Sequence, residues 1–108
     1  MSSVLNHRKI CQELVDIYAK KNADYGDSFH KSFEEEGWAM IRIRLGDKFS
    51  RLKNLTRGNS PKVSDESLRD TLMDLANYAI MSVMELDNEL KQKGLSDCEV
   101  EKYGCEEG

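Results

Sequence analysis

The segment ESLRDTLMDLANYAIMSVMELDNEL, residues 66–90, decides how this chain folds. Its apolar residues recur at steps of three and four, the repeat of a helix that buries one stripe of its surface. The stripe consists of Leu68, Leu72, Leu75, Ala79, Val83, Leu86 and Leu90. We therefore expect a helix over residues 66–90 with this stripe as its core face.

The opposite side of the same helix is poor in charge. It carries Met73, Ile80 and Met84, and between residues 72 and 84 its one charged side chain is Asp74. An isolated carboxylate inside a protein is costly, so Asp74 requires a cation or a hydrogen-bond donor. Asp70 lies one turn away, and two neighbouring carboxylates repel unless a cation neutralises them. We interpret this face as the functional site.

Length and composition limit the possibilities. A chain of 108 residues has room for one modest core, so two apolar faces on one helix predict that a second copy completes it. No long apolar run exists and the start MSSVLNHRK has no apolar signal region, so we expect a cytoplasmic protein without a membrane span. Cys11, Cys98 and Cys105 are odd in number and lack CxxC spacing, which favours reduced thiols.

The charge is unevenly distributed. The formal net charge of −4 resides in residues 95–108, an acidic tail that we expect to be mobile and dispensable, and residues 1–94 form a neutral helical domain. Within that domain a basic strip faces a single acid, Asp47. The strip consists of Arg42, Arg44, Lys48, Arg51, Lys53 and Arg57. It suits a small phosphate-bearing ligand better than long nucleic acid, although a solvated helix face would also account for it.

The rest of the chain predicts further helices. Helical spacing indicates a first helix over about residues 4–21, followed by a loop at 22–28, whose borders hold Lys21 and Tyr25. A second helix is expected over about 34–54, weakened at Gly37 and Gly46, and a connector containing Gly58 and Pro61 follows it. The fold class is therefore all-α, an antiparallel bundle of three to four helices completed by oligomerisation.

Three carboxylates on two neighbouring helices, Asp47, Asp70 and Asp74, suggest a site for Mg²⁺ or Mn²⁺, which prefer oxygen ligands. Lys21, Lys48 and Arg51 would neutralise a triphosphate around that ion. The alternative is structural: Asp70 and Asp74 would then form buried ion pairs with Arg44 and Arg51. Spacing alone favours neither.

Three segments resemble a known family. KNADYGDSF (21–29), IRLGDKFSRLKNL (43–55) and DTLMDLANYAIM (70–81) look like the nucleotide modification associated domain, type one, common in phages. That family is in turn similar to the all-α nucleoside triphosphate pyrophosphatases of the MazG type. The resemblance implies Mg²⁺-dependent cleavage of a nucleoside triphosphate to monophosphate and pyrophosphate, in a dimer or tetramer of helical bundles.

The resemblance also implies roles for residues. The MazG pattern ExxD corresponds to Asp70 and Asp74, here spaced by four, and the pattern EExxE to Asp47 alone, with Arg44 three residues earlier. Lys21, Arg44, Lys48 and Arg51 would bind phosphate; Tyr25, Asn77 and Tyr78 would contact sugar or base, unless Tyr78 is a core ring. Because the carboxylate set is reduced, two non-catalytic alternatives stay open: a nucleotide sponge that sequesters a signalling nucleotide, and a helical assembly module.

Overall fold

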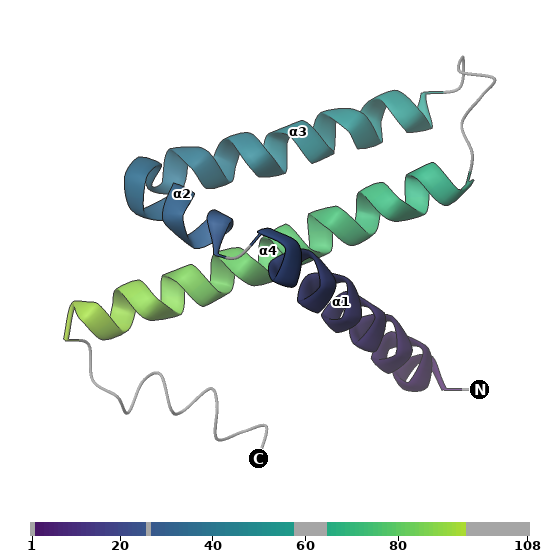
Figure 1. Ribbon diagram of the computed structural model, residues 1–108. Coiled ribbons are helices and arrows are strands. Elements are labelled where there is room, and N and C mark those ends of the chain that lie inside the picture. The colour runs from purple at the N-terminus through teal and green to yellow at the C-terminus, as the bar shows by residue number, and fades with distance from the viewer. Residues whose placement is uncertain (1, 26, 58–64, 95–108) are drawn as a thin grey trace.

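The computed structural model describes residues 2–25, 27–57 and 65–94, without the side chains of residues 24, 25, 65 and 66, and every element in this part of the chain is an α-helix (Figure 1). The helices are α1 (Ser3–Tyr25), α2 (Ser28–Glu36), α3 (Trp38–Thr56) and α4 (Asp65–Gln92). The predicted all-α class is confirmed. No helix in the described ranges is both long and apolar enough to cross a membrane.

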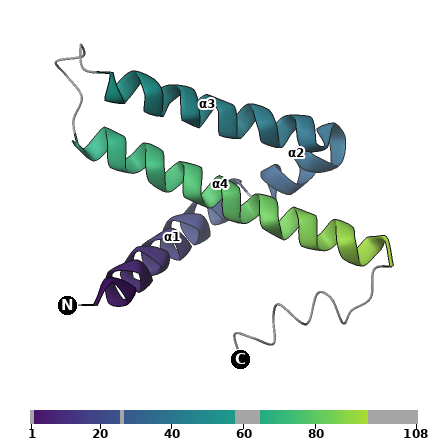
Figure 2. The same ribbon diagram turned by 180° about the vertical axis from the view of Figure 1, so that it is seen from behind.

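The helices α3 and α4 form the central antiparallel pair and lie side by side in both views (Figures 1 and 2). The short helix α2 contacts both of them at the end of the pair where α3 begins. Helix α1 crosses α4 near its middle, and its N-terminal half points away from the other helices. The middle of α4 is therefore the point where the helices converge.

Gly37 separates α2 from α3. Its φ of 69° and ψ of −151° belong to a region that is open essentially to glycine, and its N–H donates to the Phe33 carbonyl at 2.7 Å. The predicted weak point at Gly37 is confirmed as a break, whereas Gly46 lies inside α3. The predicted start near Glu34 is wrong: residues 34–36 end α2. Phe29 and Phe33, one turn apart on α2, contribute to the core and so extend helix upstream of the acids.

The predicted loop at 22–28 is also wrong for most of its length. Helix α1 continues through Asn22 to Tyr25, and α2 starts at Ser28. Turn-forming residues are tolerated here because tertiary packing outweighs local propensity: Leu14 and Lys21 of the same helix contact α4. The predicted connector around Pro61 and the acidic tail lie outside the described residues.

The predicted core face of α4 is wrong in a single chain. Leu72, Val83 and Leu86 of the apolar stripe are exposed, with Leu72 at 44% and Val83 at 56%, whereas Met73 on the other face is 7% exposed. The part of that other face around Met73 packs against neighbouring helices, where its polar groups find hydrogen-bond partners. Asn77, for example, donates its Nδ2–H to the Leu14 carbonyl of α1 at 3.2 Å. Helix α4 therefore buries the part of its site-bearing face that holds Met73 and Asn77, whereas Ile80 and Met84 of that face are exposed.

Candidate functional site

Asp74 is the point at which α1, α3 and α4 are joined. Its Oδ1 accepts a hydrogen bond from Lys21 Nζ of α1, and its Oδ2 accepts one from Lys48 Nζ of α3, each at 3.0 Å. The carboxylate is 26% exposed. The prediction that Asp74 needs a cation is thus confirmed, but the cations are Lys21 and Lys48 rather than Arg44 or Arg51.

The ionisation of Asp74 follows from these contacts. Partial burial raises the pKa of the Asp74 carboxyl, but the hydrogen bonds from Lys48 and Lys21, together with their charges, outweigh burial and hold the pKa below its ordinary value. Asp74 is therefore charged at neutral pH. Because both oxygens accept from ammonium groups, the two lysines are held in place before any ligand arrives.

A pocket of about 410 Å³ opens beside this ion-pair cluster. All four helices contribute to it. Its lining consists of Tyr18, Lys21, Asn22, Ser28, Phe29, Arg44, Asp74, Asn77, Tyr78 and Met81. The volume lies in the range of small-molecule sites, and the lining combines apolar walls with a few convergent polar groups, as such sites do.

Two aromatic rings form part of the wall. Phe29 of α2 and Tyr78 of α4 stack with their centroids 6.0 Å apart and their planes at 20°. The ammonium of Lys48 lies 6.0 Å from the Tyr78 centroid, close enough for attraction to the ring face. Tyr78 thus lines the pocket and also stacks on Phe29, as expected for a core ring. Its contact with a sugar or base stays a prediction.

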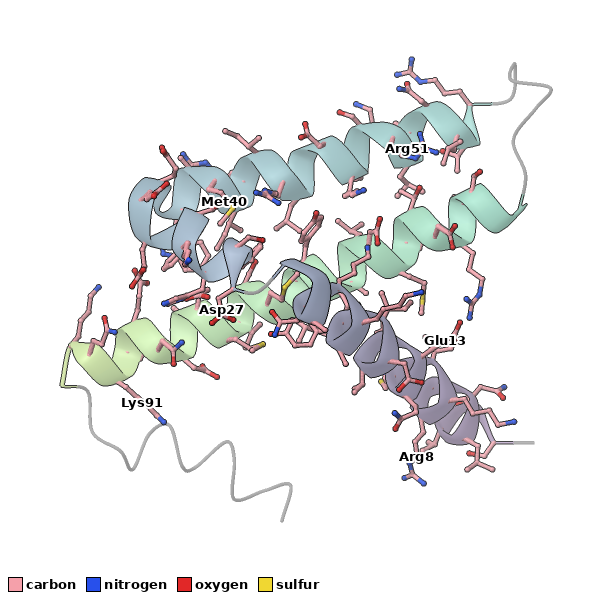
Figure 3. The ribbon with its side chains drawn as sticks, in the orientation of Figure 1. Arg8, Glu13, Asp27, Met40, Arg51 and Lys91 are labelled. Atoms are coloured by element: carbon pink, nitrogen blue, oxygen red, sulfur yellow. The ribbon has the colours of Figure 1, made fainter. Side chains whose placement is uncertain are left out.

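Arg44 and Arg51 have different surroundings. Arg44 lines the pocket half-buried, and it has no hydrogen-bond or ion-pair partner among the described residues. Arg51 points at α4 further along α3 (Figure 3), where its Nε–H donates to Thr71 Oγ1 at 3.2 Å. Of the four predicted phosphate-binding residues, Lys21 and Arg44 therefore line one pocket, Lys48 is bound to its carboxylate Asp74, and Arg51 lies outside the lining.

The three predicted metal ligands do not meet. Asp47 and Asp70 are exposed and absent from the pocket lining, and Asp74 has both oxygens engaged by lysines. Among the described residues no group of three or more His, Cys, Asp or Glu side chains is placed to hold a metal ion. The residues present thus do not fit the metal site that the resemblance implies, and a Mg²⁺ ion held by Asp47, Asp70 and Asp74 stays a prediction.

Two predicted base or sugar contacts remain to be placed. Asn77 lines the pocket, with its amide tied to the Leu14 carbonyl. The side chain of Tyr25 lies outside what the structure describes, so its role stays a prediction.

Residues 21–86 match the family described as nucleotide modification associated domain 1. The match covers more than half of the chain and includes every residue that lines the pocket except Tyr18. The chain belongs to this family. No curated protein and no solved structure matches it.

Four further residues of this member of the nucleotide modification associated domain 1 family line the pocket and were not predicted from the sequence: Tyr18, Asn22, Ser28 and Phe29. Tyr18, Lys21 and Asn22 are spaced as one helix face, which would have indicated a shared wall if the first helix had been continued past residue 21. Ser28 and Phe29 lie in the segment 21–29 that carries the family resemblance, but Ser28 was assigned to the loop at 22–28 and Phe29 to no helix.

A second cluster of this family member lies next to the pocket and was also missed. His30 of α2 binds the buried Glu85 of α4, with Nδ1 at 2.9 and 3.0 Å from the two carboxylate oxygens, and its Nε2 lies 3.3 Å from Glu34. The hydrogen bond and charge of Glu85 raise the pKa of His30 despite desolvation, with smaller contributions from Glu34 and Asp27. The cluster ties α2 to α4.

Proposed function

We propose that this protein binds a nucleotide in the pocket between its helices. The observation that carries the proposal is that two cations and three aromatic rings line one pocket of about 410 Å³, and that a third cation, Lys48, is bound to the carboxylate of that pocket, Asp74. Lys21, Lys48 and Arg44 would hold phosphate, since ammonium and guanidinium groups form strong charge-assisted hydrogen bonds to phosphate oxygens. Tyr18, Phe29 and Tyr78 would offer ring faces to the base. Membership of a family associated with nucleotide modification supports the same ligand class.

A reaction is the second candidate. The similarity of the family to MazG-type enzymes, noted from the sequence, suggests a Mg²⁺-dependent pyrophosphohydrolase that releases a monophosphate and pyrophosphate, in phage nucleotide metabolism within a host cytoplasm. The observation that favours it is the carboxylate of Asp74 in the same pocket as the cations. In such a reaction Lys48 and Arg44 would stabilise the negative charge of the phosphates.

A nucleotide sponge requires the same pocket but no reaction. One experiment distinguishes the candidates: each deoxynucleoside and ribonucleoside triphosphate is incubated with the protein and Mg²⁺, binding is measured by calorimetry, and pyrophosphate release is assayed in parallel. Turnover supports the hydrolase and binding without turnover supports the sponge. Absence of both would contradict nucleotide binding and leave the assembly module.

A further inference from the structure

The charge of the pocket limits which nucleotide it suits. Two cations, Lys21 and Arg44, share the lining with one carboxylate, Asp74, and no other charged side chain is in that lining. A third cation, Lys48, is bound to Asp74 Oδ2 at 3.0 Å. The charged residues of the lining together with Lys48 therefore carry two net positive charges. The nearby His30 is engaged by Glu85 and Glu34, so it adds no unpaired charge at this position.

A phosphate monoester carries a charge of about −1.5 to −2 at pH 7, which matches this surplus. A nucleoside triphosphate carries considerably more negative charge than the pocket neutralises. We infer that the preferred ligand of this pocket is a nucleoside monophosphate, bound as its dianion without a divalent metal. This inference rests on the nucleotide binding proposed above.

The hydrogen-bonding capacity of the cations fits this ligand. Each lysine ammonium has three N–H donors, and each gives one to Asp74 at 3.0 Å, so two donors per lysine remain for phosphate oxygens. Arg44 has five N–H donors and no partner among the described residues, and a guanidinium binds phosphate with two parallel hydrogen bonds. A phosphate can thus join the Asp74 cluster without displacing the carboxylate.

The aromatic wall accounts for the nucleoside. Stacking on a side-chain ring contributes about 1–3 kcal/mol per base in single-stranded nucleic acid complexes, equivalent to roughly fivefold or more in affinity. Tyr18 and the stacked pair of Phe29 and Tyr78 provide such rings beside the cations. A monophosphate should therefore bind more tightly than inorganic phosphate, by roughly fivefold or more.

The test is isothermal titration calorimetry on the full chain in EDTA. The titrants are the deoxynucleoside and ribonucleoside monophosphates, the matching triphosphates and nucleosides, and inorganic phosphate. We expect at least one monophosphate to bind more tightly than its nucleoside, its triphosphate and inorganic phosphate. Arg44→Gln should weaken that binding roughly tenfold or more, because a charged hydrogen-bond donor is lost. Arg42→Gln is the matched control: Arg42 is exposed on the same helix and outside the pocket lining, so the affinity should change less than twofold.

The outcomes separate this inference from the proposed function. Nucleotides that bind only with Mg²⁺, or a triphosphate that binds more tightly than its monophosphate in EDTA, would overturn the inference and leave nucleotide binding intact. No binding of any nucleotide, with or without Mg²⁺, would overturn both. If circular dichroism shows that Arg44→Gln is unfolded, Lys21→Gln replaces it, since Lys21 is largely exposed and equally part of the lining; unchanged affinity in the folded variant would overturn the inference.

Discussion

Asp74 shows how one residue connects stability to the pocket. Replacing it by Asn removes the charge shared by Lys21 and Lys48 while keeping the shape of the side chain. Because the pair is partly buried, we expect Asp74→Asn to lower the free energy of unfolding by about 1–3 kcal/mol, between the values for exposed and fully buried pairs. Thermal melts in EDTA measure this. If Asp74 were instead a metal ligand, Asp74→Asn would relieve its repulsion with Asp70 in the absence of metal. The variant would then melt at an unchanged or higher temperature than the wild type, which would contradict the pairing of Asp74 with the two lysines.

The control for this substitution is Asp70→Asn. Asp70 is exposed, and surface substitutions of this kind change stability by no more than about 0.5 kcal/mol.

The contribution of Asp74 to stability depends on pH with a definite sign. The pKa of Asp74 is lowered in the folded state, so its contribution is present at neutral pH and is lost as the pH falls through that lowered pKa. On acidification, the difference in the free energy of unfolding between the wild type and Asp74→Asn should therefore become smaller.

Gly37 and Gly46 have opposite expected responses to alanine. Gly37 adopts a φ of 69° that a residue with a Cβ rarely adopts, so Gly37→Ala should destabilise the fold by about 1–3 kcal/mol. Gly46 lies inside α3, and an added Cβ meets nothing within 4 Å, so Gly46→Ala should stabilise by about 0.5–1 kcal/mol. Urea denaturation of the two variants checks both. Equal effects of the same sign would show that the break at Gly37 is misplaced.

The link between α2 and α4 depends on His30 and Glu85. Folding raises the pKa of His30, so the stabilisation is fully present below its ordinary pKa of 6.5 and is lost as the pH rises through the raised value. We expect the melting temperature of the wild type to fall from pH 6.5 upward relative to that of His30→Gln. The matched control is His7→Gln, since His7 contacts Cys11 and no carboxylate among the described residues. A His30→Gln profile parallel to that of the wild type would contradict the link.

The helices themselves were largely predictable, but their partners were not. The spacing of apolar residues placed α4 to within two residues at either end, and the glycine at 37 indicated a break. The buried face of α4 was predicted wrongly because a single sequence does not show that Asn77 meets the Leu14 carbonyl or that Asp74 meets Lys21. Such contacts join residues more than fifty positions apart, so neither periodicity nor local charge reveals them.

The candidate site was predicted only in part, again because the sequence does not show which distant residues come into contact. Asp74, Lys21, Arg44 and Lys48 were selected by residue type; the structure brings Asp74, Lys21 and Arg44 into one pocket and binds Lys48 to Asp74. Phe29 and Tyr18 carry no charge and resemble core residues in sequence, so their place beside the cations emerged only from the crossing of α1 and α2 over α4.

The exposed side of α4 predicts how whole molecules associate. Five large apolar side chains of α4 are solvent-exposed, and helical spacing places them on one side of the helix, where they could form an association surface. The set consists of Leu72, Ile80, Val83, Met84 and Leu86. We expect a dimer or tetramer at micromolar concentration by light scattering, and Val83→Glu should shift it toward monomer because a buried unpaired charge is costly. Asn88→Glu adds the same charge at an exposed polar position of α4 and should leave the assembly unchanged. A monomeric wild type would contradict this.

A nucleotide is proposed to occupy the pocket where the four helices converge. The most direct measurement is a two-dimensional ¹H–¹⁵N NMR titration of the full chain in EDTA with the monophosphate that binds most tightly. We predict saturable shifts of the backbone amides of Asn22, Phe29, Lys48 and Tyr78, with the N-terminal turns of α1 and the end of α4 unaffected. Shifts confined to those distant ends, or no shifts at saturating nucleotide, would contradict it.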